Sequence, residues 1–416
     1  MKILQIHKYY SKKRGGGSVS AFFETKKLLE KKGHDVIVFS MQDKDNELSA
    51  ESMYFAEHFD IRKAKSIFHK LWLVPRVIYN RDAVKKLDRL LTSEKPDIAH
   101  VHNIYHYLTP GIFPVLKKHG IPIVFKLSDY HVICPNYKLF AHGKIDCSCE
   151  NGKYYKLFFN KSINNSYAES FVGMVEGYVN KWYKFYGNVD IFLAPSEFMR
   201  ELSVRYGVPR EKIKILRNVL NFDAYTKIYE KEKIFLYMGR ISDEKGLTVA
   251  VDAMKILKEK KMLNGWKFVI AGKGPHEKFL HEYVKKNNVE NVVEFAGFCE
   301  KGSDVWTNLM GQSSVAILPS VWYDNSPIAI SESMAFGSPV IVSDFGGTKE
   351  MLEDGKSGFV FKTNSSVDLA NKMQKFIDNG ELVQIMGEEA KKHIHNLNNE
   401  EKYYQTLMEI YKNICK

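Results

Sequence analysis

The sequence contains no apolar run long enough to cross a membrane as a helix. Such a helix needs about 18 to 20 predominantly apolar residues, and the first apolar stretch, residues 3–6, is followed at once by His7 and Lys8. That interruption also comes too early for the hydrophobic core of a secretory signal peptide. We therefore expect a cytoplasmic protein.

Cysteine is scarce, with five residues in a chain of 416. An odd number without a secretory signal does not describe a disulfide framework. Cys134, Cys147 and Cys149 lie close in sequence and could bind zinc if His131 or His142 supplied a fourth ligand. Because the pair is Cys-x-Cys rather than Cys-x2-Cys, we favour free thiols and predict no metal site.

Acidic residues are scarce only in the first half. Residues 1–217 contain 36 Lys and Arg against 22 Asp and Glu, whereas the remainder contains 25 against 27. A basic half suggests an anionic partner, namely a phosphorylated lipid, an anionic membrane face or a nucleic acid. The alternative is that the excess of basic residues serves only the solubility of the protein.

Two basic segments also contain many aromatic residues. They are residues 61–91 and 153–186, and the second contains Phe158, Phe159 and Trp182 among five lysines. This pattern fits a helix with a buried face, a peripheral membrane contact or a groove for single-stranded nucleic acid. No nucleic-acid motif accompanies it, so we expect no nucleic-acid partner and keep the first two interpretations open.

The chain is long enough for two domains, and short β-branched runs alternate with amphipathic stretches along it. Strands are predicted at residues 3–6, 36–40, 97–101, 122–127 and 189–195, and again at 234–238, 266–271, 292–295, 315–318 and 339–342. This alternation is typical of parallel, doubly wound sheets. We predict an α/β fold of two Rossmann-like domains facing a cleft, at 1–217 and 218–395. A final helix, 396–416, either caps the second domain or crosses back to the first.

Glycine is concentrated where a strand gives way to a helix. Gly15, Gly16 and Gly17 follow the first strand, where they either let the backbone approach a phosphate or form a tight turn. The pattern is neither G-x-G-x-x-G nor a P-loop. It is therefore weak evidence for a ligand site.

The second half places cations and glycines at two predicted strand ends. Gly239, Arg240 and Lys245 follow one strand, and Gly272 and Gly274 follow the next. Fixed cations at this edge would stabilise a nucleotide diphosphate that gains negative charge as it leaves, and arginine offers a bidentate fork to phosphate. The alternatives are solvated charges and an ordinary turn.

The segment that follows the strand at 315–318 is the most informative. Pro327 is predicted as the first residue of a helix and Ser326 as its cap. Asp324 precedes Glu332 by eight residues, about 12 Å if the segment is helical throughout. Two such carboxylates could bind hydroxyls at opposite ends of a nucleotide sugar, while Asn325 and the free N–H groups of the helix start face the diphosphate.

These residues resemble glycosyltransferase family 4, a family of retaining enzymes with the GT-B fold. The family's E-x7-E signature reads Asp324 to Glu332 here, followed by Pro339-Val340 and Gly346-Gly347. Asp324 keeps the charge of the usual Glu but is about one methylene shorter. The resemblance also covers the phosphate-binding pair Arg240 and Lys245, the glycine turns at 15–17 and 272–274, and the hinge residue Asn218.

One position departs from the family pattern. The family often has histidine before Asp129, where this chain has Ser128, and His131 follows three residues later. His131 is thus a candidate substitute in catalysis, with His102 as a second candidate. A structural role for either histidine is the alternative.

The resemblance implies retaining transfer of a sugar from a UDP- or GDP-sugar to a saccharide or lipid-linked acceptor, without a required metal or other cofactor. It places the acceptor in the first domain and the donor in the second, in cell-surface polysaccharide or lipopolysaccharide synthesis. With the basic first half, it is consistent with peripheral attachment at the inner face of the cell membrane. A nucleotide-sugar epimerase and an inactive sugar-nucleotide-binding protein are the alternatives.

Overall fold

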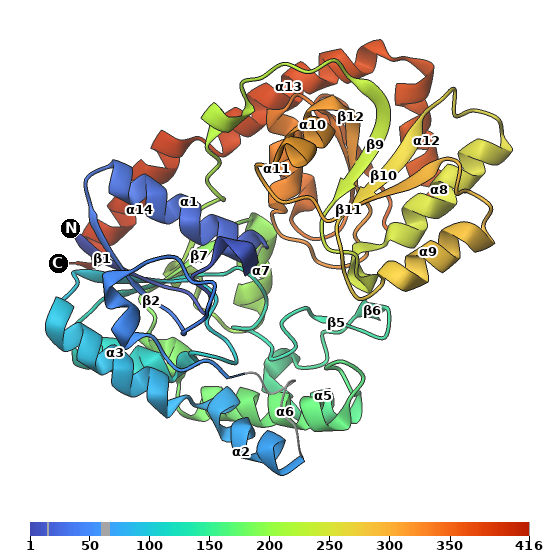
Figure 1. Ribbon diagram of the computed structural model, residues 1–416. Helices are drawn as coiled ribbons and strands as arrows, with labels where there is room; N and C mark the ends of the chain where they lie inside the picture. The colour runs from blue at the N-terminus through green and yellow to red at the C-terminus, as the bar shows by residue number, and fades with distance from the viewer. Residues whose placement is uncertain (15, 60–66, 416) are drawn as a thin grey trace. The chain divides into compact units, whose positions relative to one another are not determined.

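A computed structural model describes residues 1–14, 16–59 and 67–415 (Figure 1). Gly15 and the beginning of the basic segment 61–91 fall outside these residues. The chain forms two compact units, one of Met1–Val219 with Glu400–Lys416 and one of Leu220–Asn399. Within the described residues, no helix combines the length and the apolar content that crossing a bilayer requires.

The first unit is built on a six-stranded sheet in which every neighbouring pair is parallel, in the order β2-β1-β3-β4-β7-β8. The strands are β1 (Lys2–Ile6), β2 (Asp35–Phe39), β3 (Ile98–Val101), β4 (Ile123–Lys126), β7 (Ile191–Ala194) and β8 (Ile213–Ile215). The helices are α1 (Gly17–Lys31), α2 (Ile67–Ile78), α3 (Arg81–Glu94), α4 (Phe113–Lys118), α5 (Tyr155–Phe159), α6 (Tyr167–Trp182), α7 (Glu197–Arg205) and α14 (Glu400–Ile414).

The second unit repeats the design with a parallel sheet in the order β11-β10-β9-β12-β13-β14. The strands are β9 (Glu232–Met238), β10 (Lys267–Ala271), β11 (Val293–Gly297), β12 (Ser313–Leu318), β13 (Val340–Ser343) and β14 (Gly358–Phe361). The helices are α8 (Leu247–Glu259), α9 (Glu277–Lys286), α10 (Asp304–Gln312), α11 (Ile328–Ala335), α12 (Ser366–Asp378) and α13 (Glu381–Leu397).

The predicted fold class, two doubly wound parallel sheets, is confirmed. Inner strands of both sheets are buried on two faces, and every residue of β3, β12 and β13 is buried. Continuous apolar strands of this kind are expected where helices cover both faces of a parallel sheet. Two short strands at the sheet edges, β8 and β14, were not predicted.

The last helix, α14, belongs to the first unit. Its residues Tyr403, Leu407 and Tyr411 are buried in one apolar cluster with Ile3 of β1 and Leu28 of α1. Buried hydroxyls add specific contacts, because the Tyr403 hydroxyl lies 3.0 Å from the Thr25 hydroxyl and the Tyr411 hydroxyl lies 2.6 Å from Nδ1 of His100.

Between β4 and β7 the first unit carries an insertion that contains α5, α6 and a small hairpin, β5 (Phe140–Ala141) with β6 (Lys144–Ile145). Cys134 and Cys149 form a disulfide across the hairpin, whereas Cys147 is free. The prediction of free thiols is therefore wrong for Cys134 and Cys149. The hairpin folds the chain back on itself and brings together two cysteines that are 15 residues apart.

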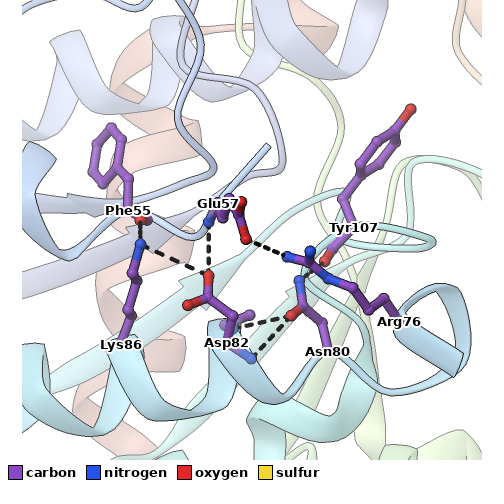
Figure 2. Close-up of polar contacts among 8 residues, drawn as sticks. Phe55, Glu57, Arg76, Asn80, Asp82, Lys86 and Tyr107 are labelled. Atoms are coloured by element: carbon purple, nitrogen blue, oxygen red, sulfur yellow. Dashed lines mark hydrogen bonds and ion pairs between the residues drawn. The ribbon is translucent and has the colours of Figure 1, made fainter. Parts of the chain in front are cut away.

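The start of α3 fastens two neighbouring segments (Figure 2). Asn80 caps α3 by accepting from the backbone N–H groups of Asp82 and Ala83, and its Nδ2 donates to the Tyr107 carbonyl at 2.6 Å. Lys86 donates to the Phe55 carbonyl at 2.8 Å. The cap residue Asn80 thus holds the loop after β3 next to α3, and Lys86 holds the segment after β2.

Candidate functional site

The predicted cations and glycines of the second unit follow adjacent strands. The strands β10, β9 and β12 are neighbours in the sheet, and their carboxyl ends lead to Gly272, Gly239 and Pro319, respectively. Because parallel neighbours end at the same edge of the sheet, the three loops meet there. Open α/β sheets bind ligands at this edge.

Glycine is required where two of these loops cross. A Cβ atom on Gly272 would lie 1.8 Å from the Gly239 carbonyl oxygen, and one on Gly274 would lie 2.0 Å from the Ile241 carbonyl oxygen. Backbone hydrogen bonds join the loops, from Gly239 N–H to the Ala271 carbonyl at 2.9 Å and from Ile241 N–H to the Lys273 carbonyl at 3.0 Å. The glycines therefore serve loop packing, and a contact with a nucleotide stays a prediction.

Lys245 and Asp324 form a close ion pair. The Lys245 ammonium lies 2.5 Å from Oδ2 of Asp324, and the two side chains are only 15% and 10% exposed. The hydroxyl of Ser320, which is fully buried, donates to the same oxygen at 2.8 Å. The Lys245 ammonium also lies 5.2 Å from the centre of the Trp322 ring. Burial makes this pair strong, since the low local dielectric screens it less than water does.

Arg240 combines an anchored position with access to solvent. Its guanidinium lies 2.7 Å from Oε1 of Glu244, which is 2% exposed, whereas the Arg240 side chain is 52% exposed. The buried hydroxyl of Tyr237 donates to the Arg240 carbonyl at 2.7 Å. Burial, with the charges of Asp324 and Glu244, holds the pKa of Tyr237 well above its usual range, so this donor stays protonated.

Glu332 lies on α11 and is almost completely buried. Its Oε1 lies 2.8 Å from the Lys301 ammonium and 3.5 Å from the Tyr225 hydroxyl. An unpaired carboxylate in this position would be costly, and Lys301, at 39% exposure, reaches it from the side of solvent. Glu332 is therefore not a surface glutamate.

The segment between the two carboxylates differs from its prediction. The helix α11 begins at Ile328 with Pro327 as its N-cap, so Pro327 is not the first helical residue and Ser326 is not the cap. Asn325 and Ser326 are half-buried in the turn before the helix. The helical rise therefore does not describe the whole distance from Asp324 to Glu332.

A further glycine fixes the position of Asp324. Gly346 has a φ of +70°, and a Cβ atom there would lie 2.3 Å from the Asp324 carbonyl oxygen. The N–H of Gly347 donates to that oxygen at 2.7 Å. The Gly346-Gly347 pair of the sequence thus positions the backbone of a candidate site residue.

The remaining predicted residues belong to the first unit. Gly16, with a φ of +90°, is the N-cap of α1, and Gly17 is its first residue. His102 is fully buried beside His100, with ring centres 4.4 Å apart. Burial, with the charges of His100 and Lys126, holds the pKa of His102 well below its usual value. Because His102 is neutral and has no access to solvent, a structural role is favoured over a catalytic one.

His131 is buried in a polar cluster that the sequence did not predict. Its Nε2 lies 3.0 Å from Oε1 of Glu176, its Nδ1 lies 3.0 Å from the Tyr186 hydroxyl, and its ring stacks on Tyr105. His106 lies 3.4 Å from the other oxygen of Glu176. Burial acts to raise the pKa of Glu176, but the charges and hydrogen bonds of both histidines outweigh it and lower the pKa to about 2.

This cluster has the side chains of a metal site. The donor atoms of His106, His131 and Glu176 all lie within 4.8 Å of one another. Two imidazoles and a carboxylate are suitable ligands for zinc. An ion pair between a carboxylate and its two histidines accounts for the same arrangement without a metal, and the part of the chain that the structure describes contains no second group of this kind.

Sequence reasoning missed the partners of the predicted site residues. Glu244, Lys301 and Tyr225 contact Arg240 and Glu332, and Glu176 contacts His131. Arg240 and Glu244 are four residues apart, but they lie in the connection between β9 and α8 and not on one helix face, so this spacing did not predict their contact. The other contacts join residues far apart in the chain.

Comparison with known proteins identifies two family models that together span most of the chain. A model described as Glycosyltransferase Family 4 matches residues 15–223, and one described as Glycosyl transferases group 1 matches residues 220–393. WcaL of Escherichia coli (strain K12), assigned to colanic acid biosynthesis, is 28% identical over 232 residues, which is 53% of this chain. The chain spans only 56% of the length of WcaL.

Solved structures agree on the fold over the whole chain. HepE of Anabaena, in complex with UDP-glucose, has a TM-score of 0.67 at 16% identity, with 99% of this chain and 100% of that chain covered. Sucrose-phosphate synthase of Thermosynechococcus elongatus has a TM-score of 0.72 at 15% identity, with 99% and 98% covered. At these identities the likeness establishes the GT-B fold alone.

Proposed function

The chain belongs to glycosyltransferase family 4, and from this premise we propose that it transfers a sugar from a UDP- or GDP-sugar to a saccharide or lipid-linked acceptor. The transfer retains the anomeric configuration, as the family resemblance implies. The second unit binds the donor and the first unit binds the acceptor. The setting is cell-surface polysaccharide or lipopolysaccharide synthesis, a proposal supported by the similarity to WcaL, which is assigned to colanic acid biosynthesis.

The buried Lys245–Asp324 pair is the observation that carries the proposal. The two charges are held at a sheet edge suited to ligands, with the Ser320 hydroxyl on the same carboxylate oxygen. An arriving pyrophosphate is an anion that can replace Asp324 as the partner of Lys245. Asp324 is then released to accept a hydrogen bond from a hydroxyl of the donor sugar.

The charges also suit the bond that breaks. The bond from the anomeric carbon to the phosphate oxygen breaks with its electron pair on the nucleoside diphosphate, and Arg240 and Lys245 stabilise that developing charge. The acceptor hydroxyl forms the new bond on the same face of the sugar. Its proton passes to the departing phosphate oxygen, so charge and atoms balance without a metal.

A thermal-shift screen with UDP-, GDP- and ADP-sugars tests donor binding, because a ligand that binds only the folded state raises the melting temperature. We expect one nucleotide class to stabilise the chain, and the UDP-glucose complex of HepE makes UDP the first candidate. No shift with any sugar nucleotide would contradict the proposal.

Transfer to acceptor extracts is then measured with Arg240→Ala and Lys245→Ala. Arg240 is half exposed, so its variant keeps the fold while losing transfer by a factor of about 100 or more. Wild-type rates in both variants would refute the assigned roles. Incubation with donor alone separates the alternatives: an epimerase converts the free donor, whereas a transferase leaves it intact or hydrolyses it slowly.

A further inference from the structure

The buried residues of helix α6 are small or polar, whereas several of its aromatic residues are exposed to solvent. Its buried residues are Ser170, Gly173, Glu176, Gly177 and Asn180. Its largely exposed aromatic residues are Tyr167 and Phe171, and Trp182 at its end is 74% exposed. A surface helix normally shows the opposite arrangement, with an apolar stripe toward the core.

Close packing fixes α6 in this rotation. A Cβ atom on Gly173 would lie 2.4 Å from Cδ1 of Ile163, and one on Gly177 would lie 2.6 Å from Cγ of Tyr154. Glu176 is held from the same side by His131 and His106. The aromatic residues therefore cannot turn inward without separating α6 from the unit.

The neighbouring helix α5 extends the aromatic surface. Phe159 is 71% exposed, and the ring of Phe158 lies 5.5 Å from that of Phe159, 5.2 Å from that of Tyr167 and 6.1 Å from that of Phe171. Eight aromatic side chains are largely exposed among the described residues, and six of them lie on this insertion. They are Tyr155, Phe159, Tyr167, Phe171, Trp182 and Tyr183, which we call the α5–α6 face.

Five lysines are interleaved with these aromatic residues in the sequence. Lys153, Lys181 and Lys184 are exposed, and Lys156 and Lys161 are half-buried. The Lys161 ammonium lies 4.4 Å from the centre of the Tyr167 ring. Between residues 153 and 184 the only acidic residues are Glu169 and the buried Glu176. The α5–α6 face therefore combines exposed aromatic side chains with an excess of positive charge.

We propose that the α5–α6 face docks in the headgroup region of an anionic phospholipid bilayer. Tyrosine, tryptophan and phenylalanine favour the interface between headgroups and acyl chains, and lysines are attracted to an anionic surface. The inference deepens the proposed function and rests on it for its purpose, which is to bring the first unit to a lipid-linked acceptor. It concerns a surface of the first unit and not the candidate donor site.

A second copy of the chain fits this face less well. A symmetric dimer brings the same patch of each copy together, so the lysines of one copy would meet those of the other. Like charges at an interface oppose association. An anionic bilayer instead attracts the lysines through its charged headgroups and accommodates the aromatic residues at the interface with the acyl chains.

Flotation with vesicles tests the docking. The full chain is mixed, without donor sugar, with vesicles of phosphatidylcholine and with vesicles in which phosphatidylglycerol replaces a third of that lipid. We expect binding to the anionic vesicles only, falling as salt is raised. Lys181→Gln with Lys184→Gln weakens it about 25-fold, since each lysine near an anionic surface accounts for about fivefold.

The apolar part is tested by Phe159→Ser with Trp182→Ser. We expect this variant to bind anionic vesicles at least about tenfold more weakly, because less apolar surface enters the interface. The matched control is Phe279→Ser with Ile385→Ser, which changes side chains of the second unit that are 50% and 56% exposed and leaves binding unchanged. Tryptophan fluorescence shifts to the blue with vesicles in the wild type, and Trp182→Phe reduces that shift.

The outcomes separate this proposal from the proposed function. Lys245→Ala is expected to bind vesicles like the wild type, and the Phe159→Ser, Trp182→Ser variant keeps its thermal shift with sugar nucleotides. Equal binding to both vesicle types, or binding that the α5–α6 variants do not change, overturns the docking surface. So does a dimer that these variants dissociate in the absence of vesicle binding.

Discussion

Removing the charge of Lys245 should have a cost that depends on Asp324. Lys245→Met keeps most of the side-chain length but removes the ion-pair partner of Asp324. The Asp324 carboxylate, which is 10% exposed, then keeps the hydrogen bond from the Ser320 hydroxyl. Asp324→Asn removes the other charge and leaves Lys245 beside the Trp322 ring. The double variant removes both charges.

The expected magnitudes follow from burial. Two unit charges 4 Å apart interact by about 4 kcal/mol at an effective dielectric constant of 20, and removing one member of a buried pair costs about 3 to 5 kcal/mol. Because the Ser320 hydroxyl still donates a hydrogen bond to Asp324, we expect Lys245→Met to lower the free energy of unfolding by about 3 kcal/mol, the lower end of this range. We expect Asp324→Asn to lower the free energy of unfolding by about 2 kcal/mol. The double variant should lower it by about 2 to 3 kcal/mol, which is less than the sum of the two single effects.

Urea unfolding of the four proteins without ligand measures the coupling. Melting temperatures with and without UDP-glucose then separate stability from donor binding, and Lys245→Met should lose the ligand-induced rise. Free energies of unfolding that simply add in the double variant would show that the two charges are not coupled. The ion-pair argument for the site would then be wrong.

Three further predictions concern the donor site and the buried carboxylate. Glu332→Ala is expected to weaken donor affinity about tenfold in calorimetry, and an unchanged dissociation constant would remove Glu332 from the site. Gly272→Ala should destabilise the second unit by about 3 kcal/mol or more, because the added methyl meets the Gly239 carbonyl, whereas Gly380→Ala meets nothing within 4 Å and serves as its control. Since the pKa of Glu176 is lowered to about 2 from 4.5, its stabilisation of about 3 kcal/mol is present above about pH 4.5 and lost as the pH falls toward 2. Glu176→Gln should therefore cost stability in urea unfolding at pH 7 and progressively less below pH 4.5, and a cost that does not change with pH would contradict this.

Local patterns were enough for the fold, and they placed the candidate site residues after strand ends. Alternating apolar runs predicted the sheets, because the period of side chains along strands and helices is set by backbone geometry. Arg240 and Lys245 follow one predicted strand, and glycine turns follow this strand and the next. Because parallel strands end at one edge of a sheet, these positions predicted that the two cations lie near the glycine turns. The strands that were missed, β5, β6, β8 and β14, are short, with two to four residues each.

The sequence by itself thus determined two parallel sheets and the strand ends at which Lys245 and Asp324 lie. Only the tertiary structure decided the partners, since Lys245 meets Asp324 across 79 positions and His131 meets Glu176 across 45. It also decided that Cys134 pairs with Cys149 and that several aromatic residues of α6 are exposed to solvent. Such contacts depend on how distant segments pack, and neither hydrophobic period nor local spacing encodes that packing.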